Sequence, residues 1–253
     1  MKKSTFYDLM TVCDEKGAGY LVLIDPDKQS VDDMIHIAEL CEQQGADGLL
    51  VGGSLLFSLD FDARVKALKE AVSIPVVLFP GTGMQLSAHA DAMLFLSLIS
   101  GRNPHFLIGE QVHAAPMIRA MDLETISTAY MLVESGITTA AQFMSNTMPL
   151  PRHKPEIAVA HGLAAQYMGM AIVYLEGGSG AEQSVPDAII HTMSKYVELP
   201  LIVGGGIKTP EEARQKVEAG ASFIVTGTVI ENNHDQQLIH DFAQAIHVKD
   251  GSA

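Results

Sequence analysis

Long apolar runs are missing from this 253-residue chain, and cysteine occurs only twice. A membrane-spanning helix needs about 20 consecutive apolar residues, so we expect no integral membrane segment. The N-terminus carries two lysines but not the apolar core of a signal peptide. Cys13 and Cys41 lack metal-binding spacing, which favours two reduced thiols in a cytoplasmic protein.

Basic residues are also scarce, because 16 lysines and arginines face 30 aspartates and glutamates, for a formal net charge of −14. This balance argues against a nucleic-acid partner, whose phosphate backbone requires a basic face. It does not exclude a small anionic ligand held locally by backbone N–H groups and a metal ion. The ten histidines show no metal-binding spacing, and no nucleophile–base pair that would indicate covalent catalysis is visible.

Apolar runs alternate with amphipathic stretches along the whole chain. Near-continuous apolar runs are typical of parallel strands covered on both faces. The eight predicted strands are residues 20–24, 48–51, 75–78, 92–98, 128–133, 170–175, 201–203 and 223–226. Helices are predicted over residues 31–44, 61–71, 104–121, 155–167, 186–196, 210–219 and 235–247. This alternation predicts an α/β fold, a closed (β/α)8 or TIM barrel, as a single domain over residues 1–253.

Two connections are irregular. GTGMQLSAHAD (81–91), between the third and fourth predicted strands, is too short for an ordinary crossover helix. Residues 135–154 contain one glycine and two prolines and are expected to form a long connection.

Glycines gather where the last two strands end. Gly204, Gly205 and Gly206 follow the seventh strand, and Gly227-Thr228 follows the eighth. The loops after these strands often bind phosphate in such barrels. The glycines would let the backbone approach an anion, and the N-terminus of the helix over 210–219 would add N–H groups. The alternative is that the glycines only form turns.

Carboxylate and hydroxyl groups follow the first two strands, in DPDK (25–28) and GGS (52–54). Asp25 and Ser54 are oxygen ligands of the kind that Mg²⁺ prefers. Alternatively, Asp27 or Ser54 caps a following helix. The roles of Lys28 and of Asn103, which either caps a helix or faces the ligand, stay open.

The most unusual stretch is YLEGGSG (174–180), which begins at the end of the sixth predicted strand. Its glycines resemble an anion cradle, yet an anion site rarely has a carboxylate beside it. From the residues alone, Glu176 is either functional or a structural carboxylate at a strand end.

Taken together, LIDPDK, VGGS, FPG, SGRNP, YLEGGSG, VGGGIKTPEEA and VTGT occur in the order and at the spacing that resemble geranylgeranylglyceryl phosphate synthases. The match covers about residues 20–232. The related bacterial branch, which includes heptaprenylglyceryl phosphate synthases, typically has a lysine two residues before the first aspartate. Leu23 stands there in this chain, which therefore looks like the second group, found in archaea and some bacteria.

The resemblance implies a modified TIM barrel with the third helix replaced by a short segment. It implies transfer of a prenyl group, with geranylgeranyl favoured, from a prenyl diphosphate to the C3 hydroxyl of sn-glycerol 1-phosphate. It also implies a homo-oligomer, either dimer or hexamer. Mg²⁺ would bind to Asp25 and Ser54, and glycerol phosphate to Tyr174, Leu175, Glu176, Gly177, Gly178, Ser179, Gly180, Gly205, Gly206, Gly227 and Thr228.

Within this picture, Glu176 and Tyr174 are the catalytic candidates. The carboxylate would orient the glycerol hydroxyls and accept a proton as general base. The prenyl tail would lie in an apolar groove where the third helix is missing, lined by Met84, Leu86 and the loop after the fourth strand.

Two other functions stay open. One is a phosphate-binding isomerase or aldolase, but no predicted strand contains a Schiff-base lysine, and the fifth offers only Glu134 as an acid. The other is a non-catalytic protein that binds a phosphorylated ligand without turnover and without Mg²⁺.

Overall fold

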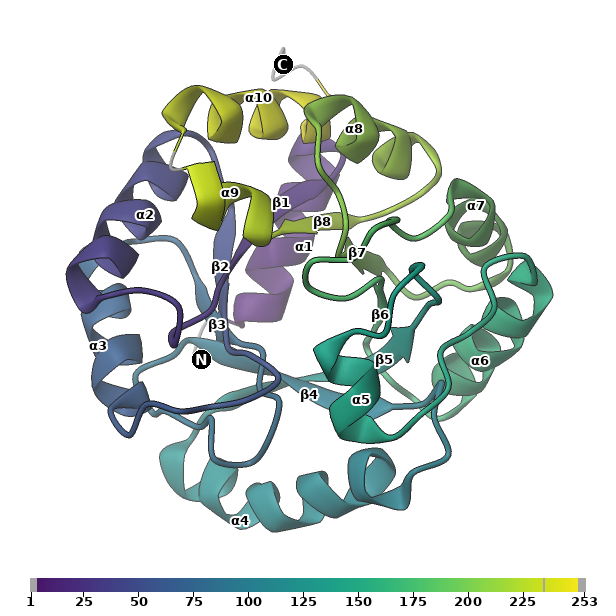
Figure 1. Ribbon diagram of the computed structural model, residues 1–253, viewed down its shortest axis with the longest axis horizontal. Coiled ribbons are helices and arrows are strands. Elements are labelled where there is room, and N and C mark those ends of the chain that lie inside the picture. The colour runs from purple at the N-terminus through teal and green to yellow at the C-terminus, as the bar shows by residue number, and fades with distance from the viewer. Residues whose placement is uncertain (1–3, 234, 250–253) are drawn as a thin grey trace.

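The structure is a computed structural model that describes residues 4–233 and 235–249. Its eight strands are all parallel and form one closed barrel in chain order, surrounded by a ring of helices (Figure 1). The predicted fold class is confirmed. The strands are β1 (Gly19–Ile24), β2 (Gly48–Val51), β3 (Val76–Leu78), β4 (Ala92–Leu98), β5 (Glu124–Leu132), β6 (Ile172–Glu176), β7 (Leu201–Gly204) and β8 (Phe223–Thr226).

All seven predicted helical regions are helical. They correspond to α2 (Val31–Gln43), α3 (Phe61–Ala71), α4 (Glu110–Met121), α6 (Pro155–Tyr167), α7 (Asp187–Tyr196), α8 (Pro210–Glu218) and α10 (Gln236–Ile246). The region predicted over 104–121 begins with a π-helical turn, η1 (His105–Gly109), before α4. Three helices were not predicted: α1 (Thr5–Lys16), α5 (Ala140–Ser145) and α9 (Thr228–Asn233). No described helix is long and apolar enough to cross a membrane.

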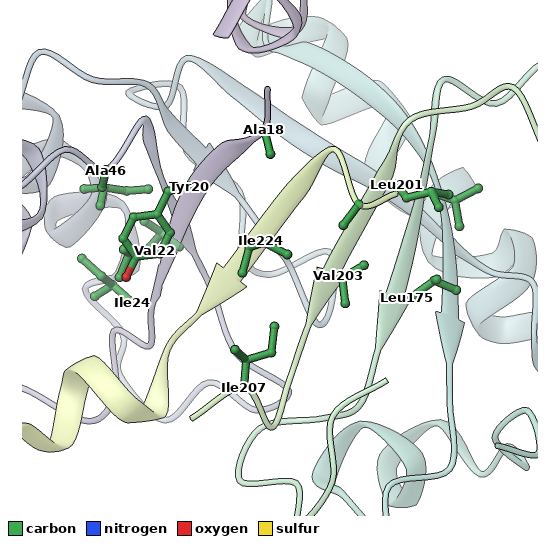
Figure 2. Close-up of a cluster of buried hydrophobic side chains, with 14 of the residues drawn as sticks. Ala18, Tyr20, Val22, Ile24, Ala46, Leu175, Leu201, Val203, Ile207 and Ile224 are labelled. Carbon is green, nitrogen blue, oxygen red and sulfur yellow. The ribbon is translucent and has the colours of Figure 1, made fainter. Parts of the chain in front are cut away.

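Side chains along each strand point alternately outward and inward, which produces two apolar layers. Side chains such as Tyr20, Val22 and Ile24 of β1 point outward, where they pack beneath the helices (Figure 2). The intervening Leu21 points into the barrel, in a second cluster that includes Leu9 of α1. Helix α1 therefore packs against the interior cluster at the end where the strands begin, and the site lies at the other end. The same period of two along β6 turns Tyr174 inward and Leu175 outward.

The connection between β3 and β4 contains no helix, as the short segment 81–91 predicted. Ordinary barrels of this class cover each strand with a helix, so this replacement leaves one side of the barrel mouth without its usual wall. The long connection predicted over 135–154 is present and contains only the six-residue α5. In Figure 1, α5 and α9 lie inside the outer ring of helices, over the barrel mouth.

Candidate active site

A cavity of about 1100 Å³ occupies the end of the barrel where the strands terminate. Its walls differ in chemistry from one side to another. Glycine-rich loops after β6, β7 and β8 form one wall, and the acidic end of β1 forms another. Apolar residues from the loop after β3 and from η1 and α4 form the third. One cavity can therefore accommodate a ligand, or a pair of ligands, with anionic and apolar parts.

Glu176 is the last residue of β6 and is only 5% exposed, although its side chain lines the cavity. Its Oε1 accepts a hydrogen bond from the Gly178 N–H. Burial raises the pKa of Glu176 to about 7, against the opposing effects of that N–H group and of Tyr174. A carboxyl group with this pKa exchanges protons near neutral pH, as a general base must.

Three aromatic rings lie next to this carboxylate. Tyr174 stacks on Phe79 with ring centroids 4.9 Å apart, and Tyr130 packs edge-on at 5.5 Å from Tyr174. The buried Tyr174 hydroxyl has no hydrogen-bond partner among the described residues, yet it is near enough to lower the pKa of Glu176. Burial and the Glu176 carboxylate raise the pKa of Tyr174 well above its usual value. The tyrosine therefore stays protonated and can donate a hydrogen bond to a ligand.

The glycine-rich loops form a close-fitting cradle beside Glu176. Four of the glycines have positive φ angles: Gly178 (102°), Gly180 (71°), Gly205 (78°) and Gly206 (73°). A Cβ atom on Gly205 would lie 2.3 Å from Oε1 of Glu176 and 2.4 Å from the Gly178 nitrogen. Any larger residue would therefore break the contact between the β6 and β7 loops. The Ser179 and Thr228 hydroxyls, 3.3 Å apart, join the β6 loop to the β8 loop.

The helix expected to contribute its N-terminus to this cradle does not do so. At the start of α8, the Thr209 hydroxyl accepts the Glu212 N–H, and the Glu212 carboxylate accepts the Lys208 N–H. Neither Thr209 nor Pro210 lines the cavity. Instead, the unpredicted α9 begins within the cavity wall at Thr228. The interpretation of α8 was wrong because three residues separate the glycines from the helix.

The end of β1 brings Asp25 close to the loop after β2. A Cβ atom on Gly53 would lie 3.2 Å from Oδ1 of Asp25, so the glycine allows the carboxylate to approach the segment that carries Ser54. Both Asp25 and Ser54 line the cavity. Neither alternative capping role is found: Ser30 caps α2, and α3 begins after Asp60.

The remaining charged residues at this end bond the β2 loop or lie next to Asp25. Asp27 accepts hydrogen bonds from the Phe57 and Ser58 N–H groups, so it holds the β2 loop. The Lys28 ammonium nitrogen, Nζ, lies 2.9 Å from Oε2 of Glu231 and 3.6 Å from Oδ2 of Asp25.

Glu231, in α9, also accepts the Asp25 N–H at 3.1 Å. Glu231 was not predicted as a site residue, because a single glutamate after a strand-end Gly-Thr has no local signature.

The third wall is built mainly from apolar residues, with polar residues of α4 such as Glu110 among them. Met84 and Leu86 both line the cavity. They belong to residues 81–91, the connection after β3 that contains no helix. Phe106 of η1 and Ala114 of α4 face it from the region after β4. An apolar groove therefore lies beside the helix-free connection after β3, where the sequence predicted it.

Some of the residues considered from the sequence lie outside the cavity lining. Leu175 packs in the outer apolar layer with its side chain turned away from the cavity (Figure 2), and Gly177 supports the cradle by donating its N–H to Gly204. Asn103 accepts the His105 N–H and donates to the Ser145 carbonyl, so it caps η1 and does not face the cavity. Glu134 is exposed on the surface.

Sequence comparison identifies relatives of this chain. The PcrB family profile matches residues 10–246. Geranylgeranylglyceryl phosphate synthase of Pyrococcus furiosus is 47% identical over 219 residues, 86% of either chain. The enzyme of the same name from Chitinophaga pinensis is 41% identical over 237 residues, which cover 92% of this chain and 93% of the relative.

Solved structures of geranylgeranylglyceryl phosphate synthases are also similar to this chain. (S)-3-O-geranylgeranylglyceryl phosphate synthase from Thermoplasma acidophilum, solved with its substrate sn-glycerol-1-phosphate, superposes with a TM-score of 0.92. It is 32% identical, and the alignment covers 97% of this chain and 99% of that one. Tryptophan synthase from Mycobacterium tuberculosis, with a TM-score of 0.65 and 13% identity, shares the fold alone.

Proposed function

This chain belongs to the PcrB family, and on that premise we propose that it is a Mg²⁺-dependent prenyltransferase that makes geranylgeranylglyceryl phosphate. The proposed substrates are sn-glycerol 1-phosphate and a prenyl diphosphate, with geranylgeranyl diphosphate favoured. The observation that carries the proposal is the position of Glu176, a buried carboxyl group at the end of β6. It lines one cavity together with the glycine cradle, Asp25 and the apolar groove.

The glycine cradle suits the phosphate group of glycerol phosphate. Gly205 and Gly206 after β7 and Gly227-Thr228 after β8 line the cavity beside Gly178, Ser179 and Gly180. Backbone N–H groups can bind a phosphate without a cluster of basic side chains. This matters because Lys28 and Lys208 are the only basic residues among the described lining residues. With the phosphate on the cradle, the glycerol hydroxyls would extend toward Tyr174 and Glu176.

The residues at the end of β1 fit Mg²⁺ by their chemistry. Asp25 supplies a carboxylate and Ser54 a hydroxyl, and the absent side chain at Gly53 allows the two segments to approach. Among the described residues, no group of three or more His, Cys, Asp or Glu could hold a metal ion. This fits Mg²⁺, which commonly takes one or two protein ligands together with water and substrate phosphates. Bound Mg²⁺ would neutralise the charge that develops on the leaving diphosphate.

The chain's own residues would act on the glycerol hydroxyl. A new bond forms between the C3 oxygen of glycerol phosphate and C1 of the prenyl group. The bond between C1 and the diphosphate oxygen breaks, and diphosphate leaves with the electron pair. The hydroxyl proton passes to Glu176, and the protonated Tyr174 hydroxyl holds the glycerol in place. Most of the rate would come from this positioning, because an allylic C1 ionises readily once the leaving group is stabilised.

Neither alternative is favoured by the site. An aldolase would need a Schiff-base lysine on a strand, and none of the eight described strands contains lysine. An isomerase with acids on strands one and five would need Glu134, which does not line the cavity. A non-catalytic binding protein would gain nothing from a buried carboxyl group with a raised pKa at its ligand, because burying it unpaired costs stability.

The decisive experiment incubates the protein with labelled sn-glycerol 1-phosphate, Mg²⁺ and prenyl diphosphates of several lengths, followed by extraction of lipid-soluble label. We expect product only with the complete mixture and with the sn-1 enantiomer. Label extracted equally well in the presence of a chelator would refute the role of Mg²⁺. The absence of product at every chain length would refute the prenyltransferase. Homo-oligomer formation and a cytoplasmic location stay predictions.

A further inference from the structure

We propose that Gln85 is a positioning residue that holds the β2 loop, and with it Ser54, in place for the diphosphate end of the reaction. This inference rests on the proposed function, because it assigns Gln85 a role in that same site. Gln85 belongs to the segment that replaces the third helix. It is completely buried, with an exposed fraction of 0%.

The side-chain amide of Gln85 is bonded to the backbone of two loops. Its Oε1 accepts the Gly53 N–H at 3.1 Å and the Gly81 N–H at 3.3 Å. Its Nε2 donates to the Gly53 carbonyl at 2.7 Å. One side chain therefore bonds both backbone polar groups of Gly53 and links the β2 loop to the β3 loop.

The two loops need such a connection because they touch backbone to backbone. A Cβ atom on Gly52 would lie 2.1 Å from the Phe79 carbonyl oxygen, and one on Gly81 would lie 2.3 Å from the Gly53 carbonyl oxygen. No side chain fits between them. These loops also lack a helix after β3 that could support them from outside. A buried amide is stable only when its hydrogen bonds are made, so Gln85 stays in place only while both loops keep this arrangement.

Gly53 lies between the two oxygen groups proposed for Mg²⁺. The Asp25 carboxylate packs against it, and Ser54 follows it directly. Fixing both polar groups of Gly53 therefore holds the backbone that lies beside the Asp25 carboxylate and leads into Ser54. The glycerol phosphate side of the cavity is built from the β6, β7 and β8 loops, and none of the three side-chain hydrogen bonds of Gln85 reaches those loops. If Gln85 has a positioning role, its loss should weaken binding of the prenyl diphosphate and leave binding of glycerol phosphate unchanged.

The test compares Gln85→Met, which removes all three hydrogen bonds at similar volume, with Gln85→Glu, which keeps the accepting oxygens and loses the donor. Gln166→Leu is the matched control. Gln166 also joins two segments through its amide, accepting the Glu198 N–H at 2.8 Å and donating to the Glu198 carboxylate at 3.4 Å, and it does not line the cavity.

For Gln85→Met we expect the Mg²⁺ requirement and the KM for prenyl diphosphate to rise about tenfold or more, as for other residues that support a metal ligand. The KM for glycerol phosphate should stay within about twofold. Gln85→Glu should show a smaller shift in the same direction, and it serves as the test if the methionine variant does not fold. Equal rises in both KM values, or no rise in either, would overturn the proposal.

A second readout does not depend on turnover. Amide hydrogen exchange, measured by mass spectrometry in peptides spanning residues 52–54 and 80–82, should be about tenfold faster in Gln85→Met and unchanged in Gln166→Leu. Unchanged exchange in Gln85→Met would contradict the positioning role even if the wild-type protein made no prenylated product. Failure of the proposed function and failure of this inference can therefore be told apart.

Discussion

Two buried carboxylates at opposite ends of the barrel behave in opposite ways. Asp47, before β2, accepts hydrogen bonds from Lys16 Nζ, the Tyr20 N–H and His247 Nε2. Burial acts to raise its pKa, but these bonds, that of His247 above all, outweigh burial and hold the pKa of Asp47 below its usual value.

Within the described part of the chain, Glu176 has only the Gly178 N–H and the nearby Tyr174 hydroxyl, so burial prevails and raises the pKa of Glu176 to about 7. Both residues are less than 10% exposed. Among the described residues, what separates them is the charge of their partners: Asp47 pairs with two basic side chains, and Glu176 pairs with none. A buried carboxylate paired with basic side chains stabilises the fold, and one without them is available for chemistry.

The largest expected effect comes from Glu176→Gln. It should lower kcat roughly 100- to 10,000-fold, the range for loss of a general base. Binding of glycerol phosphate should weaken much less, because the amide can still bond a hydroxyl. Initial rates of lipid-product formation, together with a binding isotherm for glycerol phosphate, measure both quantities. Near-normal kcat would refute the role of Glu176 as the base.

Asp47→Asn should show the reverse pattern. Removing a charge that two basic side chains share should lower the free energy of unfolding by about 2–3 kcal/mol, since it leaves buried donors poorly paired. Activity per folded molecule should change little. Chemical denaturation compared with rate measurements on the folded fraction tests this. A large loss of kcat without loss of stability would contradict the purely structural role of Asp47.

Tyr174→Phe should have a moderate effect. The hydroxyl lowers the pKa of Glu176, so its removal should move the pH profile of kcat to higher pH and cost about tenfold in rate at neutral pH. The stacking on Phe79 would be kept, so the fold should be unaffected. A pH profile identical to that of the wild type would show that Tyr174 and Glu176 are not coupled.

The smallest effect on rate is expected from Ala114→Phe, which reduces the apolar groove. Ala114 lines the cavity, whereas the adjacent Ala115 is exposed on the same helix and makes Ala115→Phe the control. Product analysis with prenyl diphosphates of different lengths should show a preference for shorter chains in Ala114→Phe alone. Unchanged chain-length selectivity would exclude this wall as the tail site.

Most of the barrel could be predicted from the sequence because parallel strands buried on both faces are continuous apolar runs. The exception is the start of β5, which is polar at Glu124 and was missed. There the Glu124 carboxylate accepts N–H groups of Thr5 and Phe6 in α1, which was itself not predicted. A strand that begins with a carboxylate needs a tertiary partner, and no local pattern reveals that partner.

The same reasoning separates the site residues that were found from those that were missed. Glu176 and the glycines stand in strand-end motifs with local signatures. Gln85 and Glu231 act through hydrogen bonds to segments 32 and 206 residues away. Their roles follow only from the folded chain, as does the turning of Leu175 away from the cavity.

The sign of the pH dependence separates the two carboxylates further. The pKa of Glu176 rises from 4.5 to about 7 on folding. Its protonated form therefore contributes stability that is fully present below about pH 4.5 and is lost as pH rises through 7, up to about 3 kcal/mol. Asp47, whose pKa is lowered, contributes stability above its usual pKa and loses it only in stronger acid. Glu176→Gln should thus gain stability relative to the wild type between pH 5 and 8.

The most direct test is a carbon-13 NMR titration of protein labelled at the glutamate side-chain carboxyl group, recorded for the wild type and for Glu176→Gln. We predict one wild-type resonance with a midpoint near pH 7, absent from the variant and shifted when glycerol phosphate binds. If every wild-type glutamate resonance titrated below about pH 5, Glu176 would be an ordinary ionised carboxylate. The assignment of the proton acceptor would then be wrong.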